Sequence, residues 1–182
     1  DDTLDALHRP LSSGPLQDSL DVIHSVCRGE DFMADYRAIL ALRDARSDWL
    51  RQAGENLRQG APSTAALTWL LWQWGRENPG WQEVFELEQS IASWKIRQPD
   101  FAEGVRARLV DKDLQPRWQC TEVTSLAAAL GSVPQASNAR WQAVLRRHGF
   151  NPASGRAIPG GRTVHNSQCQ NSLSKNESKP RS

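Results

Sequence analysis

The sequence FAEGVRARLVDKDLQPRW, residues 101–118, decides how the rest of the chain is interpreted, because a helix, a charged turn and an aromatic residue follow one another within it. Asp100 is predicted to cap the helix, and Glu103 is predicted to bond back to Asp100 in a capping box. The apolar side of this helix consists of Val105, Leu109 and Val110. We expect the helix to end near Asp111, because the charges that follow are costly to bury without partners.

Apolar residues recur at helical spacing through most of the remaining chain, and no stretch of convincing length alternates as a strand would. Residues 64–74 leave little polar face, so this helix should be central. The longest helix is expected over residues 81–98 and the last one over 138–148. The residues predicted to begin the other helices are Asp18 or Ser19, Asp31, Ser47, Asp100, and Thr121 or Thr124. These observations predict an all-α, multi-helix fold.

The composition divides the chain into three parts. Residues 1–17 mix proline, serine and glycine and are predicted to be an irregular linker. Residues 18–150 carry the helical pattern and form the predicted helical domain. Large apolar side chains nearly vanish over residues 151–182, so burial cannot offset the entropy of ordering. This tail is therefore predicted to be disordered.

Length and charge exclude several classes of protein. A chain of 182 residues with 38% hydrophobic residues is long enough for one domain with a core, but not for two large ones. The net charge of +1 gives no overall field that would attract nucleic acid or an anionic membrane. The longest apolar run, residues 65–72, is far below the ~20 residues of a membrane span. We predict neither a nucleic-acid partner nor a membrane partner.

The cysteines and the chain start bear on location. Cys27, Cys120 and Cys169 are far apart and form no Cys-x-x-Cys pair, so neither a disulfide framework nor a zinc site is indicated. Residues at the start carry no basic and apolar segments of a signal peptide, and the chain is interpreted as a fragment of a larger reading frame. Reduced cysteines suit the cytosol, and we predict a cytoplasmic location.

The pattern FxEGVRAxLVDKDxxPxW at residues 101–118 resembles the C-terminal signature of the 3-hydroxyisobutyryl-CoA hydrolases. These enzymes are the hydrolase branch of the enoyl-CoA hydratase/isomerase (crotonase) superfamily. Pro62-Ser63-Thr64 and Leu87-Glu88 stand where that family carries a Ser-Pro-Thr-Ser-Leu-like helix start and a Met-Glu-Tyr-like segment. The resemblance covers roughly Ser19 to Gly131, the later part of such an enzyme.

This resemblance implies hydrolysis of a short β-hydroxyacyl-CoA thioester, a step of valine catabolism, with coenzyme A as part of the substrate and no separate cofactor. The family's glycine-rich oxyanion loops and its acidic motif belong to the preceding half. No counterpart of either is found here, so we assign no catalytic residue and expect the isolated chain to be inactive. The helices are then interpreted as a lid and oligomerisation surface for a crotonase core, in a homo-oligomer.

Two basic residues are candidates for contacts with coenzyme A. Arg106 and Lys112 lie where the terminal helix of the wider superfamily reaches toward the adenine and phosphates of coenzyme A, and both side chains offer charged donors. Salt bridges to neighbouring acids are the alternative for both. Arg106 is the better candidate for a structural pair and Lys112 for a ligand contact. Glu103 is interpreted as a capping residue, with an active-site role as its alternative.

Other residues with chemical potential favour structural interpretations. His24, His148 and His165 share no ligand spacing, and no metal site is predicted. Phe85 and Glu88 are placed on the buried side of their helix, where Glu88 would need an ion-pair partner or a catalytic role. The eight tryptophans are interpreted as core filling, and an aromatic ligand pocket is the alternative.

Three other functions stay open at this point. The complete protein could be a hydratase or isomerase, because the residues that decide the reaction lie elsewhere. A free-standing all-α interaction module would expose apolar side chains that normally cover a core. A weaker hypothesis is nucleic-acid binding through arginines of the last helix and the basic tail.

Overall fold

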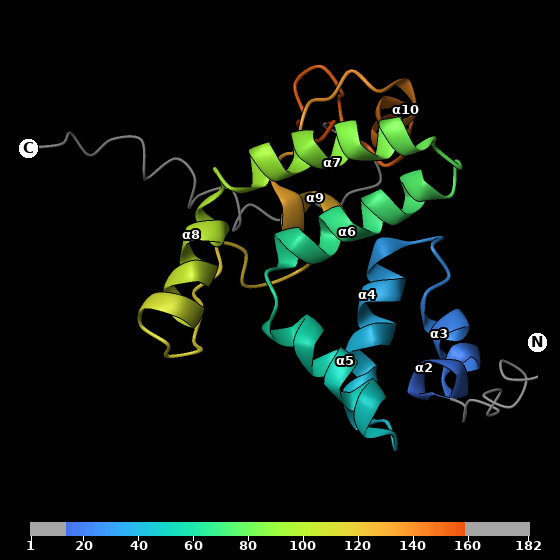
Figure 1. Ribbon diagram of the computed structural model, residues 1–182, viewed down its shortest axis with the longest axis vertical. Helices are drawn as coiled ribbons and strands as arrows, with labels where there is room; N and C mark the ends of the chain where they lie inside the picture. Colours follow the sequence, from blue (N-terminus) through green and yellow to red (C-terminus); the bar gives the residue numbers. More distant parts are fainter. Residues whose placement is uncertain (1–13, 159–182) are drawn as a thin grey trace, which may run out of the picture.

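The computed structural model describes residues 14–158, which fold into helices joined by turns and short irregular segments (Figure 1). Within this range the only β-structure is a pair of isolated bridges, so the predicted all-α fold class is confirmed. No helix in the described range combines the length and the apolar character that crossing a membrane requires.

From Leu20 onward the helices follow the predicted order, whereas a short helix at Pro15–Asp18 overlaps the predicted irregular linker. In chain order they are α2 (Pro15–Asp18), α3 (Leu20–Val26), α4 (Phe32–Ala41), α5 (Asp48–Gln59), α6 (Pro62–Gly75), α7 (Trp81–Lys95), α8 (Pro99–Val105), α9 (Leu126–Leu130) and α10 (Ala139–Arg147), with a 3-10 turn, Leu42–Asp44, after α4 and a π-helical turn, Arg106–Val110, after α8. The predicted cap Asp31 accepts a hydrogen bond from the first turn of α4, and Asn138, predicted as the first residue of the last helix, instead caps α10. Ser125 caps α9 in place of the two predicted threonines.

Helix α6 is the central element. Pro62 fits its first turn, where a backbone N–H would have no helical partner, and most of the residues that follow are apolar. Ala66 and Leu70 are fully buried, and Trp74 is almost so. Figure 1 shows α7 running antiparallel to α6, and Leu87 and Ile91 of α7 join the same hydrophobic core. The prediction that α6 lies at the centre is therefore confirmed.

The chain after α9 completes this core. Trp141, Val144, Leu145 and Phe150 are fully buried, and all belong to α10 or the turn that follows it. Residues 150–158 fold back, with Asn151 N–H donating to Arg156 O at 2.8 Å. The ordered chain therefore continues through residues 151–158, past the predicted start of the tail. Residues 159–182 of that tail, and residues 1–13 of the predicted linker, lie outside the described residues.

A buried carboxylate joins the first helices to α6. Asp35, only 4% exposed, accepts hydrogen bonds from Arg28 N at 3.1 Å, Gly29 N at 2.8 Å and the indole Nε1 of Trp69 at 2.9 Å. Gln73 Nε2 donates to Gly29 O at 2.6 Å. Gly29 has a φ of 72°, and a Cβ at this position would lie 2.3 Å from the Trp72 ring. Only glycine fits this turn.

The outer face of α7 departs from prediction. Glu88 is exposed, and Phe85 is 66% exposed, so their predicted burial is wrong. The buried stripe of α7 runs through Leu87 and Ile91, with Val84 and Trp94 partly buried beside them. Phe85 and Glu88 each follow a residue of this stripe, and one position rotates a side chain about 100° around a helix. Because apolar residues also occupy positions next to this stripe, the predicted buried side of α7 was wider than the observed one.

Replacing Asp35 tests the joint between the first helices and α6. Asp35→Ala would leave the buried donors of Gly29 and Trp69 without an acceptor, and we expect it to lower the free energy of unfolding by about 3 kcal/mol. Asp21→Ala, at an exposed position of α3, is the matched control and should change stability little. Urea denaturation of both variants measures the difference, and equal stabilities would contradict this role of Asp35.

The half-buried His148 makes stability depend on pH. The centroid of its ring lies 4.8 Å from that of the Trp69 ring, and its buried Nε2 has no hydrogen-bond partner among residues 14–158. Burial lowers the pKa of His148 below the ordinary 6.5. The unfolded chain then binds more protons, so this stabilisation is complete above pH 6.5 and is lost as the pH falls through the folded-state pKa. Unfolding measured between about pH 8 and pH 5 should show this loss, and His148→Phe should reduce it. Parallel pH curves for the two proteins would argue against the assignment.

Candidate functional site

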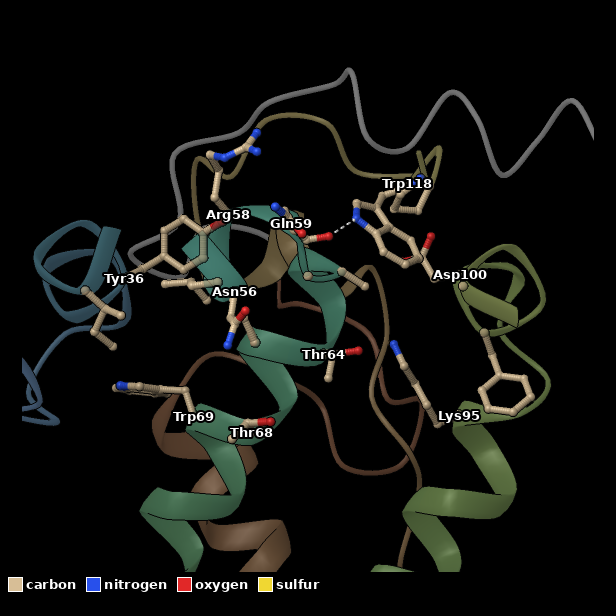
Figure 2. A pocket seen from close by; sticks show the side chains of 18 of the residues that line it. Tyr36, Asn56, Arg58, Gln59, Thr64, Thr68, Trp69, Lys95, Asp100 and Trp118 are labelled. Atoms are coloured by element: carbon tan, nitrogen blue, oxygen red, sulfur yellow. Dashed lines mark hydrogen bonds between the residues drawn. The ribbon is translucent and has the colours of Figure 1, made fainter. Parts of the chain in front are cut away.

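A cleft of about 1630 Å³ lies among the helices of the described residues. Helices α3 to α6 form one wall, and the end of α7, α8, the π turn and residues 114–118 form the other. Figure 2 shows side chains from both walls pointing into the space near the start of α6. The aromatic residues that line the cleft are Phe32, Tyr36, Trp69, Trp72, Phe101 and Trp118.

Asp100 fastens α8 beside the start of α6. Ser63 Oγ donates to Asp100 Oδ2 at 2.7 Å, and Gln119 N donates to Asp100 Oδ1 at 2.9 Å. The carboxylate is buried, lies inside α8 and makes no cap, since Gln98 is the N-cap residue. The predicted capping role of Asp100 is therefore wrong, because both carboxylate oxygens bind groups outside the helix.

Lys95 extends this buried network into the cleft. Its Nζ donates to Ser63 Oγ at 2.8 Å, and burial lowers the pKa of Lys95 below its ordinary value against the opposing effect of Asp100. Figure 2 shows the Lys95 side chain pointing into the space between Thr64 and Asp100. Ser63 is buried and does not line the cleft, so its hydroxyl serves as a link between charged groups.

Arg106 organises the turn that follows α8. Its guanidinium donates to Glu103 through Nε at 2.9 Å and through Nη2 at 2.7 Å, and Nη1 donates to Asp113 at 2.8 Å. Glu103 also accepts from Arg117 N at 2.7 Å. The Arg106 bond and then the Arg117 bond lower the pKa of Glu103 to about 2. Glu103 is thus part of an ion-pair network, and its predicted capping bond to Asp100 is wrong.

The charged turn itself has an unusual backbone. The π-helical turn spans Arg106–Val110 and is followed by Asp111 as its C-cap, so the helix ends near Asp111 as predicted. Leu114 N then donates to Ala107 O at 3.1 Å. Lys112 and Leu114 have φ values of 55° and 56°, which are costly for residues with a Cβ. Arg106 forms ion pairs with Glu103, Asp111 and Asp113. Lys112 is exposed and forms no ion pair with a described residue.

Trp118 closes one end of the cleft. Its indole Nε1 donates to Gln59 O at 3.0 Å, across from the end of α5 (Figure 2). Its ring lies over Gly104, where an added Cβ would be 3.3 Å from the ring. No pattern in the sequence indicated Gln59 as the partner of Trp118 or the Lys95–Ser63–Asp100 network.

The remaining candidates do not form a second site. Among residues 14–158 no group of three or more His, Cys, Asp or Glu side chains could hold a metal ion. His24 lines the cleft, His148 packs against the Trp69 ring, and His165 is outside the described residues. Three tryptophans are buried in the core as predicted, whereas those exposed by 40% or more are Trp49, Trp72 and Trp81.

Comparison with known proteins identifies relatives. The sequence model of a family described as enoyl-CoA hydratase/isomerase matches residues 1–131. A protein of Dictyostelium discoideum named "3-hydroxyisobutyryl-CoA hydrolase, mitochondrial" is 36% identical over 72 residues, which are 40% of this chain and 19% of that protein. Proteins of the same name from Danio rerio and Gallus gallus are 36% and 50% identical, over 42% and 21% of this chain and 20% and 10% of theirs. No solved structure matches.

These relatives confirm the resemblance and correct the predicted location. The aligned segments span about a fifth or less of each relative, and all three relatives carry the hydrolase name. All three are also named as mitochondrial, which points to the mitochondrion and makes the cytoplasmic prediction wrong. The prediction from the cysteines failed because unpaired cysteines indicate only that a compartment is reducing. They do not distinguish one reducing compartment from another.

The Arg106 network predicts how the turn responds to mutation. Arg106→Ala removes the common partner of Glu103 and Asp113, so the strained backbone of residues 111–117 should loosen. We expect faster hydrogen exchange at the amides of Gln115 and Arg117, with little change in α6. Arg97→Ala removes an exposed arginine without an ion pair in the described residues and serves as control. Unchanged exchange at both amides would show that Arg106 does not hold the turn.

Proposed function

Because this chain belongs to the enoyl-CoA hydratase/isomerase family, we propose that it is the helical part of an acyl-CoA hydrolase and covers a catalytic core formed by residues outside it. The proposed reaction is attack of water on the thioester of a short β-hydroxyacyl-CoA, which releases the hydroxy acid and coenzyme A. The names of the three relatives support this substrate class. This reaction would place the complete protein in valine catabolism.

The observation that carries the covering role is the apolar tip after α8. We use this name for Leu109, Val110 and Leu114, which are 68–69% exposed. The Arg106 ion pairs hold the tip in one conformation, with Asp111 and Asp113 on its polar side. Apolar side chains fixed in an exposed position are typical of a surface that packs against another part of a protein. We propose that the tip packs against the core, and that the same contact contributes to a homo-oligomer.

Lys112 is the proposed contact with coenzyme A. Its ammonium stands on the turn beside the apolar tip, exposed and without an ion pair to a described residue, so it is available to a phosphate. The guanidinium of Arg106 already donates to Glu103, Asp111 and Asp113. We therefore propose a positioning role for Arg106, and a direct contact of Arg106 with coenzyme A stays a prediction. No cofactor is proposed beyond the coenzyme A of the substrate.

The reacting groups are proposed to lie in the core. Thioester hydrolysis needs N–H donors directed at the developing oxyanion and a carboxylate that activates water. In the described residues the buried carboxylates of Asp35 and Asp100 are committed to structural hydrogen bonds. A hydratase or isomerase reaction of the same family remains the alternative, and its products distinguish it from hydrolysis.

Reconstitution tests this function. The chain alone should not release thiol from 3-hydroxyisobutyryl-CoA, whereas a mixture with the Dictyostelium relative lacking its aligned segment should form a complex and hydrolyse the thioester. Lys112→Glu should raise KM roughly tenfold in that complex through the loss of one charge-assisted contact. Arg146→Glu, on the exposed side of α10, is the matched control. Rapid turnover by the chain alone, or failure of the two parts to associate, would contradict the proposal.

A further inference from the structure

The ammonium group of Lys95 has fewer partners than its position requires. Lys95 is half-buried at the end of α7, and its Nζ faces the cleft (Figure 2). An ammonium group carries three donors, but the hydroxyl of Ser63, at 2.8 Å, is its one hydrogen-bond acceptor among the described residues. No carboxylate in the described range forms an ion pair with it. A partly desolvated cation with free donors is stabilised by an anion.

Ser63 and Asp100 fix the direction of this cation. The Ser63 hydroxyl donates its proton to Asp100 at 2.7 Å, so a lone pair of the same oxygen accepts from Lys95. The other oxygen of Asp100 accepts from Gln119 N, and Asp100 itself is 6% exposed. The carboxylate therefore lies behind the serine, and it leaves the cleft side of the ammonium open. An arrangement of this kind holds a charged donor in place before a ligand arrives.

The rest of the cleft suits a ligand with an apolar body. Aromatic rings of Trp69, Phe101 and Trp118 line it, and Thr64 stands beside Lys95. Arg108 lines the same cleft and forms no ion pair or hydrogen bond through its side chain with any described residue. A mostly apolar surface with a few fixed polar groups is the usual composition of a small-molecule site.

We propose that the cleft is a binding site for a small anionic ligand, and that Lys95 binds its carboxylate or phosphate group while an apolar chain lies along the aromatic wall. Ser63 is a positioning residue in this site, because it acts through Lys95. The proposal does not depend on the proposed hydrolase function, since binding is measured on this chain without any core.

Ligands that differ only in the head group test the proposal. Binding of hexanoate, hexyl phosphate, 1-hexanol and inorganic phosphate to the full chain is followed by calorimetry and by tryptophan fluorescence. At least one of the two hexyl anions should bind about tenfold more tightly than 1-hexanol, because only an anion forms charge-assisted hydrogen bonds with Lys95. The preferred hexyl anion identifies the head group as carboxylate or phosphate. Equal binding of all three hexyl compounds, or no binding of any, would overturn the proposal.

Variants assign the preference to Lys95. Lys95→Met keeps the aliphatic length and should reduce the affinity for the preferred anion to the level of 1-hexanol, with 1-hexanol binding unchanged. Arg97→Met removes an exposed positive charge outside the cleft and should leave both affinities unchanged. Retained anion preference in a folded Lys95→Met protein would refute the assignment. If Lys95→Met does not fold, the shift of the Lys95 Nζ resonance on adding the anion decides, and its absence overturns the proposal.

Discussion

Helix α6 is mostly apolar, and the need to cover its apolar side organises the molecule, while Thr64, Thr68 and Trp72 face the cleft. Helices α7, α9 and α10 bury its apolar residues in one hydrophobic core. Polar groups of α6 fasten other segments: Trp69 binds Asp35 of α4, Gln73 binds Gly29 in the turn before α4, and Ser63 binds Asp100 of α8. Apolar packing therefore joins α6 to α7, α9 and α10, whereas buried hydrogen bonds join it to α4 and α8.

The cleft is a consequence of this arrangement. Helix α5 leads into the start of α6, and α8 follows the end of α7 that lies beside it. Figure 1 shows α5 and α8 diverging from this point. Two long-range contacts keep the walls in place: the Trp118 indole reaches the end of α5, and Asp100 reaches α6. The apolar tip and the cleft lining therefore depend on the same anchors. A surface of this kind suits both a covering role over a core and the binding of a small ligand.

Local features were predictable from the sequence, and pairings between distant residues were not. The cap Asp31 bonds within its own first turn, so the local sequence alone identified it. Asp100 has the same chemistry, but its partners are 37 and 19 residues away, and no local pattern reveals them. The Arg106 pairing was among the predicted alternatives because its acids are close in sequence. Lys95 gave no signal, since a lysine that ends a helix is normally solvated.

The hydrophobic core extends beyond the segment that matches the family model. The family match ends at residue 131, yet the fully buried Trp141, Val144, Leu145 and Phe150 all lie beyond it. Arg140 and Arg147 add ion pairs to Glu83 and Glu77, at the two sides of the turn between α6 and α7. Domain borders drawn from sequence similarity would cut through this core. A chain that ended at residue 131 would lose α10 and leave apolar residues of α6 uncovered.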